Sequence, residues 1–311
     1  MVQSQLDAVT GAFSYTGKYI ARRLLADGKQ VLNLTRNPGR EHEFGSQLRS
    51  VPFNFEDPEA LSASLAGAAT LFNTYWIRFI YSSWTFDQAV NNTRILVEAA
   101  RKAGVQRIVH VSVTNASADS PLAYFRGKAA VEELVRNCGL SYAIIRPTLI
   151  FGLEDLLLNN IAYLLRRYPV FAIPGDGSYR LQPISAEETA DLCIRAAQKS
   201  RNLELDAAGP DILTFHELVR MLKIHTGSRA QLVNLRAGLA LGFSRLIGWL
   251  TNDITLTREE LRGLMDELLV SDQPPAGKTR LEDWLREHGK DLGKYYVSEL
   301  KRNYIKYKTP K

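Results

Sequence analysis

Two side chains suited to acid–base chemistry, Tyr124 and Lys128, lie four residues apart in this 311-residue sequence. In a helix this spacing places both on one face. A free phenol has a pKa of about 10, and a neighbouring ammonium group lowers that pKa by stabilising the phenolate. The pair therefore predicts a catalytic site that gives or takes a proton near neutral pH.

A hydroxyl side chain would complete such a site, and the segment Arg107–Val113 with the following Thr114 offers two. If the segment is an extended strand, His110, Ser112 and Thr114 face the same way. Either Ser112 or Thr114 could donate a hydrogen bond to substrate, or neither does. His110 is expected to be an interior side chain, because no partner ligands for a metal are spaced around it.

A glycine-bounded turn, Gly11-Ala-Phe-Ser-Tyr-Thr-Gly17, follows a short apolar strand and runs into a helical pattern. Backbone amides at a helix N-terminus bind an anion when no side chain blocks its approach. Gly11 supplies a tight turn, Gly17 permits close packing of helix on strand, and the Ser14 hydroxyl could donate to a phosphate. The cofactor-binding residues predicted here are Gly11, Phe13, Ser14, Tyr15, Thr16 and Gly17.

The end of the second strand indicates which dinucleotide binds. An acidic residue there would bind the ribose 2′-hydroxyl of NAD, whereas this sequence has Arg36, which suits a 2′-phosphate. We therefore expect NADP(H) to be favoured over NAD(H).

The elements that position these residues alternate between short β-rich runs and longer helical patterns, which is typical of a parallel sheet wrapped by helices. We expect an α/β fold, a doubly wound Rossmann sheet with a smaller α-rich C-terminal lobe. Residues 1–150 would form the cofactor domain, with strands returning to it from 180–210. Residues 151–311 would form the substrate lobe and a helical extension, including helices over 257–269, 279–288 and 291–307.

Composition excludes several classes of protein. The net charge of +6 is modest and no basic stripe indicates nucleic-acid binding. The two cysteines, Cys138 and Cys193, have neither metal spacing nor a framework of pairs and indicate free thiols. We find no signal peptide and no uninterrupted apolar stretch of about 18 residues. We expect a cytoplasmic protein without metal, in which the apolar run 237–250 is a core helix rather than an amphipathic face on a membrane or partner.

These motifs together resemble the extended and atypical branches of the short-chain dehydrogenase/reductase superfamily, over about residues 5–225. The resemblance rests on the turn from Thr10 to Gly17, the YxxxK pair Tyr124–Lys128, Arg146-Pro147-Thr148 with Ile150-Phe-Gly152, and Pro174-Gly-Asp-Gly177. The subgroup that looks most alike is similar to the NADPH-binding accessory subunit of respiratory complex I.

The resemblance implies further cofactor contacts. Asn54 and Phe55 match positions beside adenine, Asn73 and Thr74 match positions beside the ribose, and Lys128 matches the lysine that hydrogen-bonds the nicotinamide ribose. The residues matching the segment that flanks the nicotinamide are Pro147, Thr148 and Ile150.

Two departures from the family pattern bear on activity. Val113 occupies the place of the usual catalytic serine, with Ser112 one position earlier, so the resemblance supports cofactor binding more firmly than turnover. Leu181 occupies the place of the arginine that binds a nucleotide-sugar diphosphate, which argues against a nucleotide-sugar substrate.

Three functional hypotheses follow. The first is an NADP(H)-dependent oxidoreductase or epimerase-like enzyme for a small substrate. The aromatic run between Tyr75 and Trp84 makes a lipophilic substrate a candidate. The second is a non-catalytic NADP(H)-binding or redox-sensing subunit with a protein partner. The third is a peripheral membrane enzyme in contact with lipid through its C-terminal helices.

Overall fold

The computed structural model describes residues 6–304, except for the side chain of Leu250. The chain forms two compact units. The first unit consists of residues 1–148, 185–208 and 273–277, and the second of residues 149–184, 209–272 and 278–311. Each unit has its own apolar core among the described residues.

The first unit is built on a seven-stranded parallel sheet with the strand order β3-β2-β1-β4-β5-β6-β11. The order reverses between β1 and β4, and such switch points bind ligands at the carboxyl ends of the strands. The strand bounds are β1 Leu6–Thr10, β2 Gln30–Thr35, β3 Leu48–Pro52, β4 Ala68–Asn73, β5 Arg107–Val111, β6 Ser141–Pro147 and β11 Leu203–Ala207.

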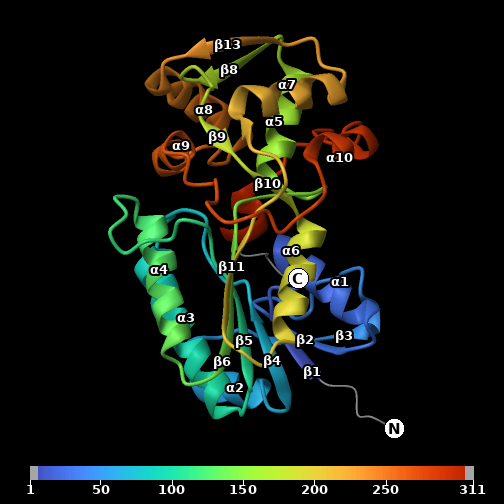
Figure 1. The fold of residues 1–311 in the computed structure, drawn as a ribbon, viewed down its shortest axis with the longest axis vertical. Helices are drawn as coiled ribbons and strands as arrows, with labels where there is room; N and C mark the ends of the chain where they lie inside the picture. Colours follow the sequence, from blue (N-terminus) through green and yellow to red (C-terminus); the bar gives the residue numbers. More distant parts are fainter. Residues whose placement is uncertain (1–5, 305–311) are drawn as a thin grey trace, which may run out of the picture. The chain divides into compact units, whose positions relative to one another are not determined.

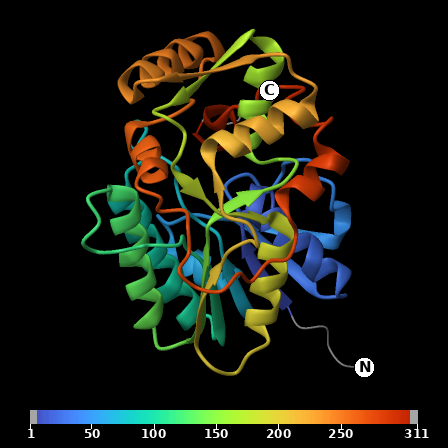
Figure 2. The same ribbon diagram turned by 45° about the horizontal axis from the view of Figure 1, so that its top comes forward.

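Helices cover both faces of this sheet. Figures 1 and 2 show α1 and α6 on one face and α3 and α4 on the other, with α2 beside α3. The bounds are α1 Tyr15–Ala26, α2 Pro58–Ser64, α3 Phe86–Lys102, α4 Ala123–Arg136 and α6 Ala186–Ala197. The predicted doubly wound fold is confirmed.

Local chemistry explains these boundaries. β5 is buried along its whole length, as expected for a strand with helices on both faces. The side chains of Asp57, Thr85 and Ser185 accept N–H groups in the first turns of α2, α3 and α6. Gly28, Gly104 and Gly139 follow α1, α3 and α4 with positive φ, which glycine adopts at helix ends.

The second unit is richer in helix, as predicted for the C-terminal lobe. Its helices are α5 Leu156–Arg167, α7 Phe215–Thr226, α8 Ala237–Thr251, α9 Arg258–Met265 and α10 Leu281–His288, and residues Leu300–Tyr304 form a π-helical turn η2. Phe151, Leu158, Leu218 and Leu222 are among the fully buried residues of its core. A capping box in which Thr214 and Glu217 exchange hydrogen bonds begins α7.

Short strands in this part were not predicted. Three two-stranded sheets pair β7 with β10, β9 with β12, and β8 with β13. Their bounds are β7 Leu149–Phe151, β8 Val170–Pro174, β9 Arg180–Leu181, β10 Pro183–Ser185, β12 Leu213–Thr214 and β13 Gln231–Leu235. Polar and apolar residues do not alternate in these short runs, so their sequences carried no period-two signal.

The predicted helix over 291–307 is wrong in its described part. Only Leu300–Tyr304 is helical there, and residues 305–307 lie outside the described residues. Gly293 has positive φ, and a Cβ at this position would lie 2.3 Å from the backbone nitrogen of Tyr163. The chain turns where a regular helix was expected, because this glycine packs directly on the backbone of α5.

No helix among the described residues has the length and apolar character to cross a membrane.

Candidate functional site

The glycine turn lies between the end of β1 and the start of α1. Gly11 has φ of 68°, a conformation that favours glycine. A Cβ on Gly17 would lie 2.3 Å from the carbonyl oxygen of Gly11, so no side chain fits there. Both glycines are therefore required by the geometry, and together they bring the amino end of α1 against the end of β1.

Ser14 is the residue before α1, and its hydroxyl has a partner within the turn. The hydroxyl donates to the carbonyl oxygen of Gly11 at 2.5 Å. The contact of this hydroxyl with a phosphate, expected from the sequence, stays a prediction. The hydrogen bond of Ser14 closes the turn directly before the first backbone N–H groups of α1.

Residues at the end of β4 form hydrogen bonds with the end of β1, directly before the glycine turn. The Thr74 N–H donates to the Thr10 hydroxyl at 2.8 Å, and the Thr74 hydroxyl donates to the Thr10 carbonyl oxygen at 2.6 Å. Asn73 is fully buried; its side-chain oxygen accepts from the Tyr75 N–H, and its amide nitrogen lies 3.2 Å from Nδ1 of His110. Asn73 and Thr74 thus fix the strand ends under the turn.

Asn33 is a site residue that the sequence analysis missed. It is fully buried in β2, and its side-chain oxygen accepts the Ala12 N–H at 2.8 Å. Its amide nitrogen donates to the Ser50 hydroxyl on β3 at 3.1 Å. A polar residue within the apolar run Gln30–Thr35 was the available signal, because a buried amide needs hydrogen-bond partners.

Arg36 follows β2, as predicted, and its guanidinium carbon lies 4.7 Å from the ring centroid of Trp84. Stacking uses the face of a guanidinium group, whose N–H donors lie in its plane. Trp84 thereby orients the arginine that the sequence assigned to the 2′-phosphate.

The two residues assigned to adenine lie after β3. Asn54 is exposed, and its side-chain oxygen accepts the Glu56 N–H at 3.0 Å. Phe55 is half-buried, with ring centroids 4.5 Å from Phe53 and 5.1 Å from Tyr75. Burial raises the pKa of Tyr75, whose hydroxyl accepts from Asn92. The three rings form an apolar wall beside the carboxyl ends of the strands.

Lys128 lies buried on α4, one turn after Tyr124. Its ammonium donates to the carbonyl oxygen of Val111 at 3.1 Å and lies 5.0 Å from the ring centroid of Trp76. Burial lowers the pKa of Lys128 to about 7, and the nearby Glu132 partly opposes this. A lysine with that pKa can change charge near neutral pH.

Trp76 is a second residue that sequence reasoning did not place in the site. Its ring contacts Tyr124 edge-on at 6.0 Å and stacks on Phe86 at 5.8 Å. A Cβ on Gly127 would lie 2.8 Å from Cη2 of Trp76, so this glycine makes room for the indole between Tyr124 and Lys128. The aromatic run had indicated packing or a pocket wall, but not that Trp76 lies against the tyrosine and the lysine.

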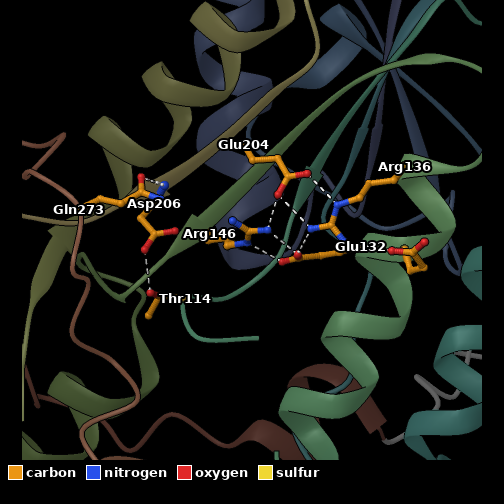
Figure 3. A network of polar contacts seen from close by, with 8 residues as sticks. Thr114, Glu132, Arg136, Arg146, Glu204, Asp206 and Gln273 are labelled. Atoms are coloured by element: carbon orange, nitrogen blue, oxygen red, sulfur yellow. Dashed lines mark hydrogen bonds and ion pairs between the residues drawn. The ribbon is translucent and has the colours of Figure 1, made fainter. Parts of the chain in front are cut away.

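The hydroxyl candidates differ in their partners. Thr114 is fully buried and donates to Oδ2 of Asp206 at 3.0 Å (Figure 3). Ser112 is also buried, and its hydroxyl has no hydrogen-bond partner among the described residues. Both lie at the end of β5, as expected, but only Thr114 is engaged by a carboxylate.

Two further buried polar atoms near Lys128 have no hydrogen-bond partner among the described residues. They are Nε1 of Trp76 and Nε2 of His110. The pKa of His110 is well below its usual range because of burial, followed by the charge of Lys128, so the imidazole is neutral. Buried polar groups are nearly always hydrogen-bonded. These atoms, with Ser112 Oγ, are chemically suited to polar groups of a bound nicotinamide nucleotide or substrate.

A buried charge network lies further along α4 (Figure 3). Arg146 on β6 donates to both carboxylate oxygens of Glu132, at 2.8 and 2.7 Å, and to Glu204 on β11 at 2.5 Å. Arg136 on α4 also contacts both carboxylates. The Glu132 side chain is only 3% exposed and forms ion pairs with both arginines.

The segment assigned to the nicotinamide divides between the units. Pro147 accepts the Thr114 N–H, and the Thr148 N–H donates to Ala207, all within the first unit. Ile150 lies on β7 in the second unit.

The structure also describes the position at which Leu181 replaces the arginine of the family pattern. Leu181 is fully buried, and Arg180 forms an ion pair with Glu267 at 2.6 Å, all in the second unit. Among the described residues no cluster of potential metal ligands is found.

Known proteins share parts of this sequence and this fold. An NAD(P)H-binding family model matches residues 11–155. The mitochondrial NADH dehydrogenase (ubiquinone) 1 alpha subcomplex subunit 9 of Arabidopsis thaliana is 28% identical over 225 residues, covering 69% of this chain and 56% of that protein. The chain thus spans little more than half of this relative. Photosystem II assembly factor Ycf39 of Cyanidium caldarium is 23% identical over 78% of each chain.

Among solved structures, an NADPH-dependent quinone oxidoreductase of Escherichia coli in complex with NADPH superposes with a TM-score of 0.72. The match covers 91% of this chain and 99% of that one at 21% identity, which shows the shared fold. The first unit thus has a Rossmann fold, and residues 11–155 match an NAD(P)H-binding family model.

Proposed function

We propose that this protein is an NADP(H)-dependent oxidoreductase or epimerase-like enzyme that acts on a small substrate. The observation that carries the proposal is Lys128, a buried ammonium on α4 whose pKa is lowered to about 7 and which lies one helical turn from Tyr124. Lysines are almost never fully buried unless they are paired, and lysines with strongly perturbed pKa values concentrate at functional sites.

The residues divide the work as follows. Backbone N–H groups between Gly11 and Gly17 hold the pyrophosphate, and Arg36 contacts the 2′-phosphate. A bound nicotinamide nucleotide supplies or accepts a hydride. Tyr124 gives or takes the proton, and Lys128 stabilises its phenolate when charged.

Between the two hydroxyl candidates we favour Ser112 as the hydrogen-bond donor to substrate. Thr114 already donates its proton to the Asp206 carboxylate. Ser112 has a buried hydroxyl with no partner among the described residues, so a substrate oxygen would satisfy it.

The test is hydride transfer from NADPH to a panel of carbonyl and quinone compounds. Quinones are included because the solved structure with the same fold is named a quinone oxidoreductase. Wild type should turn over at least one compound, and Tyr124→Phe should lose about two to four orders of magnitude in kcat. Equal rates would remove Tyr124 from the mechanism. Ser112→Ala should lose activity while Ser117→Ala, in the following loop, keeps it.

The preference for NADP(H) is tested by titrating NADPH and NADH. Arg36→Gln should weaken NADPH binding and leave NADH binding unchanged, because only NADPH carries the 2′-phosphate. Arg49 lies on β3, and Arg49→Gln is the control. If wild type binds both nucleotides equally, the assignment of Arg36 fails.

A second candidate function is a non-catalytic NADP(H)-binding subunit that stabilises a larger assembly. It is favoured by the displaced serine and by the relatives, which are named a subunit of NADH dehydrogenase and an assembly factor. Capture of a stable partner that is lost on Arg36→Glu, with no turnover of any substrate, would support it. A cytoplasmic location is part of both proposals and is tested by cell fractionation.

A further inference from the structure

Helix α8 in the second unit buries three small residues and exposes four large apolar ones. Ala240 and Ser244 are 6% and 9% exposed, and Gly248 is buried. A Cβ on Gly248 would lie 2.5 Å from the carbonyl oxygen of Asp253, so the chain that follows α8 packs closely on this side of the helix. The sequence predicted a core helix here, and that prediction is wrong for most of the large side chains of α8, which are exposed.

The outward side is strongly apolar. The exposed side chains include Leu239 at 58%, Phe243 at 54%, Leu246 at 52% and Trp249 at 78%. Their spacing of three, four and seven residues places them on one helix face. A surface helix of a protein surrounded only by water shows the reverse pattern. Contiguous exposed apolar faces mark interaction sites.

The chain segment that contains this face carries acidic residues nowhere and basic residues throughout. Residues 218–252 contain no Asp or Glu, and their cations are Arg220, Lys223, Arg229, Arg236 and Arg245. Arg236 is the residue before α8, and Arg245 lies within it next to the apolar face; both are exposed. An arginine at the rim can extend its guanidinium beyond the apolar surface to an anion.

We propose that α8 is a membrane-surface helix, which docks the second unit on a bilayer containing anionic phospholipid. The four large side chains enter the headgroup–acyl boundary, with Trp249 at the polar interface where indoles are favoured. Arg236 and Arg245 contact lipid phosphates.

An apolar face with a cationic rim fits this occupant better than a second copy of the chain. A copy would bring the same acid-free segment, so like charges would meet across a symmetric interface. An anionic bilayer supplies the missing negative charge over the whole face. The inference is independent of the proposed enzymatic function, because no residue of α8 belongs to the cofactor site.

The test is flotation of the full-length protein with vesicles of phosphatidylcholine alone and of phosphatidylcholine with about one-third phosphatidylglycerol. Wild type should float with the anionic vesicles and remain behind with the neutral ones. Arg236→Gln and Arg245→Gln should each lower the partition coefficient about fivefold, and added salt should do the same. The double variant Phe243→Gln, Trp249→Gln should abolish flotation.

Tyr295→Gln is the matched control, because Tyr295 is 82% exposed but lies outside α8, and it should float like wild type. Emission from Trp249, obtained by subtracting the spectrum of Trp249→Phe, should shift to the blue on anionic vesicles. All variants should keep the NADPH affinity of wild type. Absence of flotation, or sedimentation showing that the Phe243, Trp249 double variant converts a dimer to a monomer, would overturn the proposal.

Discussion

Gly17 shows how a single missing side chain fixes the cofactor turn. Because a Cβ there would lie 2.3 Å from the Gly11 carbonyl oxygen, Gly17→Ala must push α1 away from β1. We expect a loss of about 1–3 kcal/mol in the free energy of unfolding and loss of NADPH binding. Urea denaturation and nucleotide titration measure the two effects. Gly39→Ala, where a Cβ has nothing within 4 Å, is the control and should change neither.

Replacing Lys128 is expected to have opposite effects on activity and on the free energy of unfolding. Its pKa is about 7 in the folded protein and 10.5 when unfolded, so folding carries the full cost of burying its charge below pH 7. This cost fades as the pH rises from 7 to 10.5. Lys128→Met should therefore lose activity, yet raise the urea midpoint relative to wild type most strongly below pH 7.

The measurement is urea denaturation of both proteins between pH 6 and 10. A difference in midpoint that stays constant over this range would contradict the lowered pKa of Lys128.

Among the elements, α4 has the largest role in positioning the site, because it carries both Tyr124 and Lys128. The network of Glu132, Arg136, Arg146 and Glu204 attaches the carboxyl half of this helix to β6 and β11 (Figure 3). Glu132→Gln leaves the arginines without the buried carboxylate, and we expect a loss of about 3 kcal/mol in stability. Glu133→Gln, at the neighbouring 65% exposed position, should lose less than about 1 kcal/mol.

Chemical denaturation of the two variants at pH 7 compares them directly. Equal midpoints would mean that the network does not hold α4. The arginines also lower the pKa of Glu204 to about 2, so the stability it contributes is present above pH 4.5 and is lost as the pH falls toward 2.

At the scale of the whole molecule, the two units have separate apolar cores. NADPH at about 100 times its Kd should stabilise the protein by about 2.7 kcal/mol. Because the cofactor residues other than Ile150 lie in the first unit, we expect hydrogen exchange to slow in β1, α1 and β4. Exchange in α7 is expected to keep its rate. Equal protection of α7 would show that cofactor binding couples the two cores.

The sequence by itself determined the features that depend on local pattern. The Rossmann sheet followed from apolar runs alternating with helical periods, and the turn from Gly11 to Gly17 followed from its place between strand and helix. The pairing of Tyr124 with Lys128 on one helix face followed from their spacing. Each of these depends on residues close together in the chain, where 3.6- and 2-residue periods determine which side chains share a face.

Only the tertiary structure decided the contacts between distant residues. Asn33 supports the turn from 21 positions away, and Trp76 meets Lys128 because Gly127 leaves room on α4. Glu132 is buried because Arg146, 14 positions along the chain, neutralises it. Helix α8 is equally apolar in sequence whether it faces inward or outward, and only the structure shows Ala240 and Ser244 buried with Phe243 and Trp249 exposed. Such choices depend on the partners that the fold brings together, which no local period encodes.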